Sequence, residues 1–157
     1  MREGFIILIF LSSKLFAQNS LLIPRIDSSV KSINQLNKKK EIFLTDLGQY
    51  EFITKDSFIV KVVYEFRNNY KKVKKEFYFE KLKGIIYATE TETNYLGNDS
   101  VIWIGRFYFE KSRLADYITI GHGKSETDDW EPEKDILVSY YKVLDRITSY
   151  QLRSKAE

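Results

Sequence analysis

A five-residue motif that occurs twice constrains the fold of this chain more than any other feature of its sequence. The segment from Phe77 to Lys81 reads FYFEK, and the same letters recur from Phe107 to Lys111. Within each copy, alternate aromatic residues fall on one face of an extended strand. Each copy is followed by residues that suit a turn and then by a second apolar run. We therefore expect each copy to open a β-hairpin made of a strand, a tight turn and a returning strand.

The positions of the two turns follow from this pattern. The first hairpin is predicted to turn at residues 81–84 and to return over residues 85–93. The second is predicted to turn near Ser112 and Arg113 and to return over residues 114–120. Both returning segments contain the β-branched and aromatic residues that strands favour.

A looser third copy of the hairpin is expected ahead of these two. It begins at Tyr50, Glu51 and Phe52, and it turns at residues 55–57. It then continues into a strand from Phe58 to Phe66 whose alternate residues are apolar. Because hairpins in series form a meander, the sequence predicts one antiparallel sheet of five to seven strands.

Both ends of the chain have a helical period. Apolar residues recur three or four positions apart from Leu22 to Leu36 and again from Leu137 to Ile147. The second stripe includes Tyr140, Tyr141 and Leu144. A run of strands between two helices indicates an α+β domain, with both helices packed on one face of an antiparallel sheet. The length of 157 residues allows one such domain, over residues 18–157, and not two.

The first 17 residues are typical of a secretory signal peptide. Arg2 precedes the short apolar run GFIILIFL, and the small residue Ala17 ends the segment. The run is shorter than the roughly 20 residues that span a bilayer. We expect cleavage after Ala17 and a periplasmic or secreted protein without a membrane anchor, because the chain has no cysteine to carry a lipid. The alternative is a buried N-terminal strand or helix.

The composition removes several kinds of catalytic site. The chain has no cysteine and one histidine, which excludes thiol catalysis, thiolate zinc sites, iron–sulfur clusters and multi-histidine metal centres. It has no nucleophile-elbow, phosphate-loop or dinucleotide-binding motif. The single histidine, His122, is interpreted as a loop residue because it has no second histidine to work with. The sequence therefore predicts no catalytic residue, no metal and no cofactor, and it favours a protein without enzymatic activity.

Two groups of acidic residues have both a structural and a functional interpretation. Glu90 and Glu92 are two positions apart and so share a strand face, where paired carboxylates can serve glycoside hydrolysis. We interpret them instead as charges on the solvent face of an edge strand, which hinder aggregation. The acidic residues from Glu126 to Asp135 lack the order of a calcium loop, and they are better explained by the N-terminus of the second helix.

Lysines and aromatic residues give the candidate binding residues. Lys72 and Lys74 lie in a basic run near Tyr78, a combination that single-stranded nucleic-acid sites use. A net charge of only +3 and the expected export argue against nucleic acid. The expected partner is therefore an acidic protein or an anionic glycan of the cell envelope. Tyr108 and Trp103 are the further candidates for an aromatic contact surface.

Three features of the chain belong together: the paired segments FYFEKLKGIIYA and FYFEKSRLADYI, the Ala17-Gln18 step after the apolar run, and the closing helix. They resemble a group of small exported proteins of Bacteroidota-type bacteria. Proteins of that group combine a signal peptide, a helix, a Tyr- and Phe-rich β-meander and a C-terminal helix. The turn after Lys81 departs from the Asn-Gly type expected in that pattern. The resemblance implies the α+β meander fold, and it implies no activity and no site residue.

The leading functional hypothesis is a periplasmic or secreted module, without catalysis, that binds a protein or an envelope component. The binding surface would be the sheet face that the helices leave bare, or its basic rim. An immunity or inhibitor protein is a specialised form of this hypothesis. One alternative is a carrier that holds a small apolar ligand between the sheet and a helix, and another is a carboxylate-based glycan hydrolase. The sequence leaves the oligomeric state open.

Overall fold

The computed structural model describes residues 21–36, 40–68, 70–94 and 100–154. The chain divides into two compact units, Met1–Leu36 and Asn37–Glu157. In the first unit, residues 21–34 form the helix that the apolar period predicts. The expected packing of this helix on the sheet stays a prediction. The predicted signal peptide, residues 1–17, lies outside the described residues.

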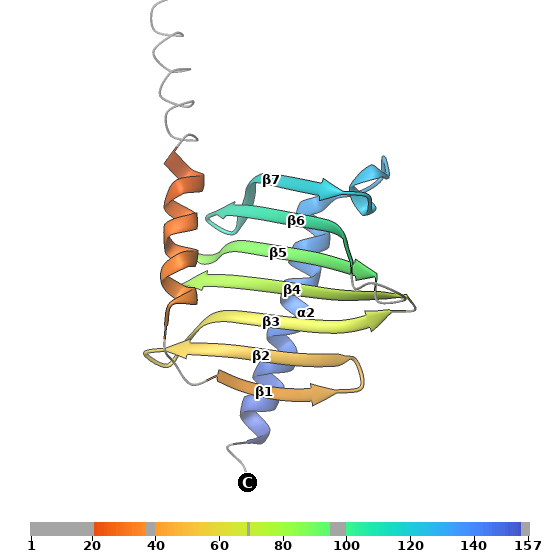
Figure 1. Ribbon diagram of the computed structural model, residues 1–157. Coiled ribbons are helices and arrows are strands. Elements are labelled where there is room, and N and C mark those ends of the chain that lie inside the picture. The colour runs from red at the N-terminus through yellow and green to blue at the C-terminus, as the bar shows by residue number, and fades with distance from the viewer. Residues whose placement is uncertain (1–20, 37–39, 69, 95–99, 155–157) are drawn as a thin grey trace, which may run out of the picture. The chain divides into compact units, whose positions relative to one another are not determined.

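The second unit is a sheet of seven antiparallel strands followed by one long helix (Figure 1). The strands are β1 (Lys40–Thr45), β2 (Gly48–Lys55), β3 (Phe58–Asn68), β4 (Lys71–Glu80), β5 (Gly84–Asn94), β6 (Ser100–Glu110) and β7 (Arg113–Gly121). Each strand pairs with its neighbours in sequence, so the sheet is the predicted meander. A short 3-10 helix, η1 (Lys124–Glu126), leads to helix α2 (Pro132–Arg153). The α+β fold class is confirmed.

The repeated motif supplies the first strand of two equivalent hairpins, β4–β5 and β6–β7, and β2–β3 is a third. Phe52, Phe77 and Phe107 occupy the same position in the three hairpins, and all three side chains are buried. In each hairpin the returning strand carries one extra residue near the turn, a β-bulge. The extra residues are Val60, Ile86 and Ala115. The looser copy therefore aligns with the motif through Phe52 and not through its expected starting residue, Tyr50.

Two of the hairpin turns have two residues each. Asp56 and Ser57 join β2 to β3, and Lys111 and Ser112 join β6 to β7. All four residues have positive φ, between 51° and 62°. This is the geometry of a type I′ turn, whose twist matches that of the flanking strands. The turn expected near Ser112 and Arg113 is thus one residue too late, because Arg113 already belongs to the ladder.

The turn between β2 and β3 offers a stabilising substitution. Asn-Gly adopts positive φ with less strain than the native Asp56 and Ser57, so Asp56→Asn with Ser57→Gly should raise the free energy of unfolding by about 1 kcal/mol in urea titrations. The control, Lys81→Asn with Leu82→Gly, alters the β4–β5 turn, where neither of these residues has positive φ. The control pair should give no gain, and an equal gain at both turns would contradict the turn geometry.

Helix α2 crosses one face of the sheet, here named the helix face, from β7 toward β1 (Figure 1). Near the start of α2, the Glu133 carboxylate accepts a hydrogen bond from the Leu114 backbone N–H of β7 at 3.2 Å. Near its end, Tyr150 stacks on Phe43 of β1 with 4.3 Å between the ring centroids. One helix therefore spans the sheet from edge strand to edge strand.

The buried stripe of α2 differs in detail from the predicted one. Ile136, Val143 and Ile147 are its buried residues, and the sequence analysis included only the last of them. Tyr141, which was expected in the stripe, is 60% exposed. Its ring lies at the margin of the stripe and packs on Tyr140 at 4.8 Å instead of on the sheet.

The core lies between α2 and the helix face. Its largest fully buried side chains come mainly from the first strand of each hairpin, where aromatic residues alternate. They include Phe52, Phe77, Trp103, Phe107 and Phe109. Alternation sends the intervening residues to the other side of the sheet, here named the opposite face. The repeated motif thus specifies which face of the sheet packs against α2.

Candidate functional site

The five residues predicted to bind a partner do not share one face of the sheet. Lys72, Lys74, Tyr78 and Tyr108 lie on the opposite face, because they alternate with the residues that face α2. Trp103 lies on the helix face and is 0% exposed. Tyr78 and Tyr108 are also buried, with exposures of 3% and 2%, so the predicted aromatic contact surface is wrong. Among the five predicted residues, only Lys72 and Lys74 keep partly exposed side chains.

On the opposite face, the predicted lysines belong to a ladder of alternating charges. The Nζ atom of Lys72 lies 2.9 Å from the Glu65 carboxylate, and that of Lys74 lies 3.3 Å from the Glu76 carboxylate. Glu76 also pairs with Lys61 at 3.0 Å. Carboxylates on the neighbouring strand β3 and on β4 itself thus offset the charge of the basic run, and Lys71 and Lys75 of the same run point to the helix face.

A row of three tyrosines lies beside this ladder. Tyr87 stands between Tyr78 and Tyr108, with centroid distances of 5.5 Å and 5.1 Å. The Nζ atom of Lys61 lies 4.8 Å from the centroid of the Tyr78 ring, within reach of a cation–π contact. The structure therefore brings Tyr78 and Tyr108 together through Tyr87, which the sequence analysis did not select.

The pair of Lys61 and Glu76 in this ladder is ionised at neutral pH. Burial lowers the pKa of Lys61, but the hydrogen bond with Tyr78 and the charge of Glu76 raise that pKa overall above its ordinary 10.5. Burial raises the pKa of Glu76, but Lys61 and Lys74 bring it overall below its ordinary 4.5. A raised lysine pKa and a lowered glutamate pKa are expected when the two groups form an ion pair, because each stabilises the charged form of the other.

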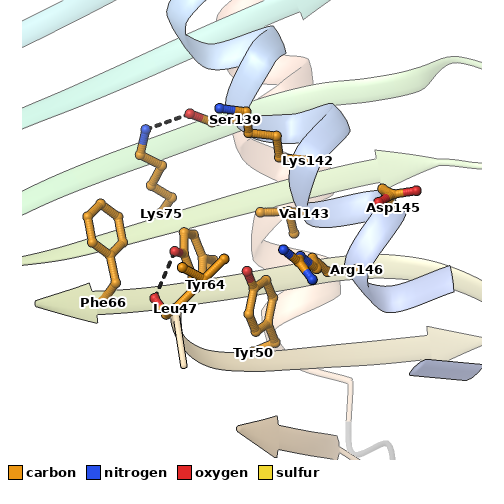
Figure 2. Close-up of a pocket in the computed structure, with 10 residues that line it drawn as sticks. All are labelled: Leu47, Tyr50, Tyr64, Phe66, Lys75, Ser139, Lys142, Val143, Asp145 and Arg146. Carbon is orange, nitrogen blue, oxygen red and sulfur yellow. Dashed lines mark hydrogen bonds between the residues drawn. The ribbon is translucent and has the colours of Figure 1, made fainter. Parts of the chain in front are cut away.

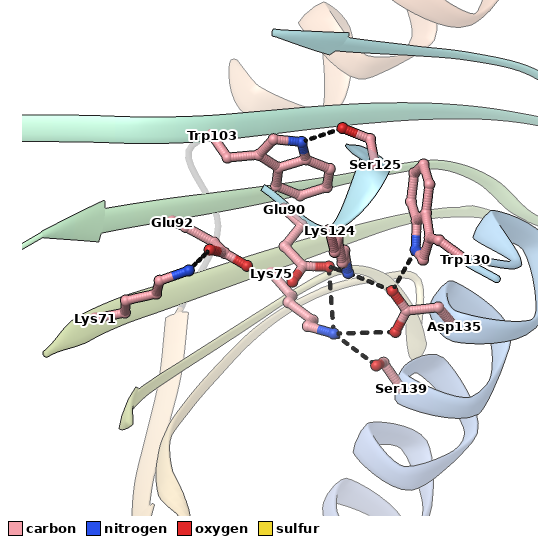
Figure 3. A network of polar contacts seen from close by, with 10 residues as sticks. All are labelled: Lys71, Lys75, Glu90, Glu92, Trp103, Lys124, Ser125, Trp130, Asp135 and Ser139. Carbon is pink, nitrogen blue, oxygen red and sulfur yellow. Dashed lines mark hydrogen bonds and ion pairs between the residues drawn. The ribbon is translucent and has the colours of Figure 1, made fainter. Parts of the chain in front are cut away.

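A second charge cluster is buried on the helix face, where β4, β5, η1 and α2 meet (Figure 3). The Nζ atom of Lys75 donates to Ser139 Oγ at 2.7 Å and lies 3.3 Å from Glu90 Oε2. The Nζ atom of Lys124 lies 2.6 Å from the same Glu90 oxygen and also contacts the Asp135 carboxylate. Two ammonium groups and two carboxylates balance one another, as buried charges require. We call Lys75, Glu90, Lys124 and Asp135 the buried cluster.

Two tryptophans border the buried cluster. Trp103 Nε1 donates to Ser125 Oγ at 2.9 Å, and Trp130 Nε1 donates to Asp135 Oδ2 at 3.1 Å. Their rings meet almost at right angles, with centroids 6.0 Å apart. Lys124 Nζ lies 5.1 Å from the Trp103 ring. These contacts hold the η1 segment against the sheet.

The interpretation of Glu90 and Glu92 as solvent-facing charges on an edge strand is wrong. Strand β5 lies between β4 and β6, and both side chains point to the helix face with exposures of 3% and 8%. Glu92 pairs with Lys71 at 2.8 Å, as Glu90 pairs with the two lysines of the buried cluster. Both carboxylates are therefore engaged in structural ion pairs, which is not the arrangement of an acid and a nucleophile flanking a glycosidic bond.

Ser139 and Lys75 form the contact that most resembles a catalytic pair. A serine hydroxyl is activated when a neighbouring base takes its proton. Here Lys75 Nζ is the donor to Ser139 Oγ, and it also faces the carboxylates of Glu90 at 3.3 Å and Asp135 at 4.0 Å. An ammonium group donates to Ser139 and cannot accept its proton. The contact therefore anchors α2 to β4 and does not prepare a nucleophile.

A groove of about 470 Å³ lies next to the buried cluster, between α2 and strands β2 to β4 (Figure 2). Its volume lies within the range of small-molecule sites. Aromatic rings from the strands form one side of the groove, and polar and basic side chains of α2 form the other. It is lined by Leu47, Tyr50, Tyr64, Phe66, Lys75, Ser139, Lys142, Val143, Asp145 and Arg146.

The aromatic side of the groove belongs to a stack of five rings. The order is Tyr150, Phe43, Tyr50, Tyr64 and Phe66, with successive centroid distances of 4.3, 4.9, 4.5 and 5.0 Å. Neighbouring ring planes differ by 21° or less. The strand register places these rings in line, so Tyr50, Tyr64 and Phe66 form a continuous aromatic wall along the groove.

Tyr64 is fixed in this stack by a hydrogen bond. Its hydroxyl donates to the Leu47 carbonyl oxygen at 3.0 Å. Burial, together with Tyr50, raises the pKa of Tyr64 to about 12, and the nearby charge of Arg146 acts in the other direction. The phenol is therefore neutral at physiological pH, and the charge of the groove comes from other side chains.

The remaining candidates from the sequence have structural roles. His122 lies in an exposed loop, as expected, with Nδ1 2.6 Å from the Glu126 carboxylate. Glu133 and Asp135 occupy the first turn of α2, behind Pro132, which confirms their assignment to a helix N-terminus. Within the described residues, no group of three or more potential ligands is placed to hold a metal ion. No helix in that part of the chain combines the length and the apolar character needed to cross a membrane.

Comparison of the chain with protein-family models, with curated proteins and with solved structures gives no match. The inferences about function below therefore depend on the geometry of the chain itself.

The sequence analysis missed the groove. Ser139, Lys142, Val143 and Arg146 recur at the three- and four-residue spacing of a helix, which places them on one side of α2 beside the apolar stripe. These basic and polar residues beside the apolar stripe are the sequence pattern from which the groove could have been predicted. Tyr64 was assigned to an apolar strand face, and the sequence gives no indication that its ring borders a groove.

The buried cluster predicts a loss of stability in acid. Burial raises the pKa of Asp135, but hydrogen bonds from Lys124 and Trp130 and the charges of Lys124 and Lys75 bring it below its ordinary 3.8. A carboxylate with a lowered pKa stabilises the fold above its unfolded pKa, and this contribution is lost as the pH falls through the folded pKa. Urea titrations should therefore show stability declining below about pH 4. Asp135→Asn should reduce that decline, and Asp128→Asn, in an exposed loop, should not.

Proposed function

We propose that this protein is a binding module without enzymatic activity, and that its ligand site is the groove between α2 and strands β2 to β4. The observation that carries the proposal is the pairing of an aromatic wall with basic side chains across one groove of about 470 Å³. Tyr64 and Phe66 provide the apolar surface, and Lys142 and Arg146 provide the charge. An apolar surface with a few placed polar groups is the usual composition of a small-molecule site.

The expected signal peptide indicates where the protein would meet its ligand. An exported module meets ligands in the periplasm or outside the cell, so the ligand would be a component of the envelope or of its surroundings. Among the hypotheses from the sequence, the groove favours the small-ligand carrier over a module that binds a macromolecule.

A second candidate function is the binding of a protein or an envelope glycan by the opposite face of the sheet. The exposed part of the charge ladder, at Lys72 and Lys74, favours it. The tyrosine row of Tyr78, Tyr87 and Tyr108 is buried and leaves a partner little surface. An immunity or inhibitor role would use the same residues.

Amide chemical shifts of the ¹⁵N-labelled protein distinguish the two candidates. The protein would be titrated with a panel of small amphiphiles that are anionic, neutral or cationic. If the groove is the site, the largest shift changes should occur at Leu47, Tyr64 and Val143. Changes centred on Lys72 and Tyr78 would support the second candidate, and a panel without any effect on the groove would contradict the proposal.

Two variants make the experiment specific. Phe66→Ala removes one wall of the groove and should weaken binding of the best amphiphile about tenfold, because it removes an aromatic contact worth about 1 kcal/mol or more. Leu82→Ala is the matched control, because Leu82 is an apolar residue of a turn and is 96% exposed. Equal losses in both variants would show that the shift changes do not report a ligand in the groove.

A further inference from the structure

We propose that the groove selects a small anion that carries a flat apolar body, with aromatic carboxylates as the nearest simple examples. This inference rests on the proposed function and adds the chemical class of the ligand. It follows from the hydrogen-bond donors along the α2 side of the groove and from the end of the ring stack on the other side.

The basic side chains of the groove differ in what they already bind. Lys75 is engaged in the buried cluster, where it contacts Ser139 and Glu90. Lys142 and Arg146, in contrast, make no ion pair within the part of the chain that the structure describes. Both are exposed and border the groove. These two cations are therefore available to an anionic group, and a guanidinium can hold a carboxylate through two parallel hydrogen bonds.

The other polar groups at the groove also favour an anion. Ser139 Oγ accepts a hydrogen bond from Lys75, which leaves the O–H of Ser139 able to donate. Asp145 is the one acidic side chain among the lining residues. In Figure 2 its carboxylate points away from the tyrosine rings, whereas the guanidinium of Arg146 is directed toward them. The polar side of the groove thus offers donors and positive charge.

The aromatic side of the groove explains why the anion needs a flat body. Phe66 is the last ring of the stack, and within the described residues its only ring contact is with Tyr64. A planar ligand that lies against Phe66 continues the stack in the offset geometry that aromatic pairs prefer. Such a contact contributes to affinity in addition to the burial of apolar area. A small inorganic anion would make no such contact, and a cation would face Lys142 and Arg146.

Three probes with the same ring system test the charge requirement. They are 2-naphthoate, 2-naphthamide and 2-naphthylmethylammonium, which are anionic, neutral and cationic at pH 7. Dissociation constants would be measured by calorimetry with the full protein, and amide shifts would locate the site. We expect 2-naphthoate to bind at least about tenfold more tightly than 2-naphthamide, as charge-assisted hydrogen bonds imply. The ammonium probe should bind most weakly.

Substitutions then assign the preference to the two cations. Lys142→Gln with Arg146→Gln should remove most of the preference for 2-naphthoate and leave the affinity for 2-naphthamide nearly unchanged. The control is Lys134→Gln, which removes one positive charge from α2 at a residue that pairs with Glu131 and does not line the groove. The control should keep the preference. All of these side chains are exposed, so the variants should fold, and thermal unfolding would verify this.

The possible outcomes distinguish a wrong ligand class from a wrong binding site. If 2-naphthamide or the ammonium probe binds the groove as tightly as 2-naphthoate, the anion selectivity is refuted and the groove remains the site. If the double variant keeps the preference, Lys142 and Arg146 do not confer it and the inference fails. If no probe shifts the amides of the groove, the proposed function fails together with the inference.

Discussion

Glu90→Gln is expected to lower the free energy of unfolding by about 3 kcal/mol. The substitution removes the carboxylate that lies 3.3 Å from Lys75 and 2.6 Å from Lys124. Two ammonium groups then share one carboxylate of the cluster, that of Asp135, so one positive charge is no longer balanced. An unpaired buried charge is costly because the protein does not replace its lost hydration. Urea unfolding at pH 7, followed by circular dichroism, measures the change.

Two further variants distinguish lost pairing from a general disturbance of the core. Adding Lys75→Met to Glu90→Gln removes the unbalanced positive charge and should restore about 1–2 kcal/mol. Glu92→Gln is the matched control, because Glu92 lies on the same face of β5 but its partner Lys71 is 48% exposed. The control should cost about 1 kcal/mol or less. Equal losses at the two glutamates, with no recovery in the double variant, would contradict the role of the buried cluster.

Trp103→Ala should be the most destabilising substitution in the core, with an expected loss of about 4 kcal/mol. The ring is 0% exposed. A Cβ atom placed on Gly105 or on Gly123 would come within 2.6 Å or 2.7 Å of it, so both backbone segments already pack tightly against the ring. Neighbouring groups that are backbone atoms of two different segments cannot easily collapse into the cavity. Urea unfolding measures the loss.

Milder and exposed substitutions serve as references for Trp103. Trp103→Phe keeps an aromatic ring, so it should lose less, although it gives up the hydrogen bond to Ser125. Leu82→Ala removes apolar atoms from a residue that is 96% exposed and should change stability by less than about 0.5 kcal/mol. A Trp103→Ala variant as stable as Leu82→Ala would show that the tryptophan belongs to a surface and not to the core.

The topology of the sheet could be predicted because the information is local. Two copies of FYFEK, each followed by a turn, specify hairpins, and hairpins in series pair with their sequence neighbours. The exact turn residues were harder to predict, because Lys111 and Ser112 adopt positive φ without the glycine or asparagine that usually marks such a turn. The tertiary contacts of the hairpins override this local preference.

The functional residues could be predicted less well because their arrangement is not local. Glu90 and Glu92 were assigned to a solvent face, since alternating charged residues usually face water, and only the placement of Lys75 and Lys124 makes their burial favourable. Those two lysines come from β4 and from the segment before α2. Similarly, the groove needs Arg146 to lie over a strand that ends about eighty positions earlier in the chain. The periodicity of a single segment does not predict a contact between two distant segments.

Helix α2 also has a consequence for how the chain is made. The hairpins use contacts between sequence neighbours, so they can assemble one after another as the polypeptide leaves the ribosome. The element that shields their aromatic side chains, Pro132–Arg153, is synthesised after all of them. Until those residues emerge, a nearly complete sheet exposes a hydrophobic face to other nascent chains nearby. A product released early, before residue 132, would thus be prone to aggregate even though its strands had already paired.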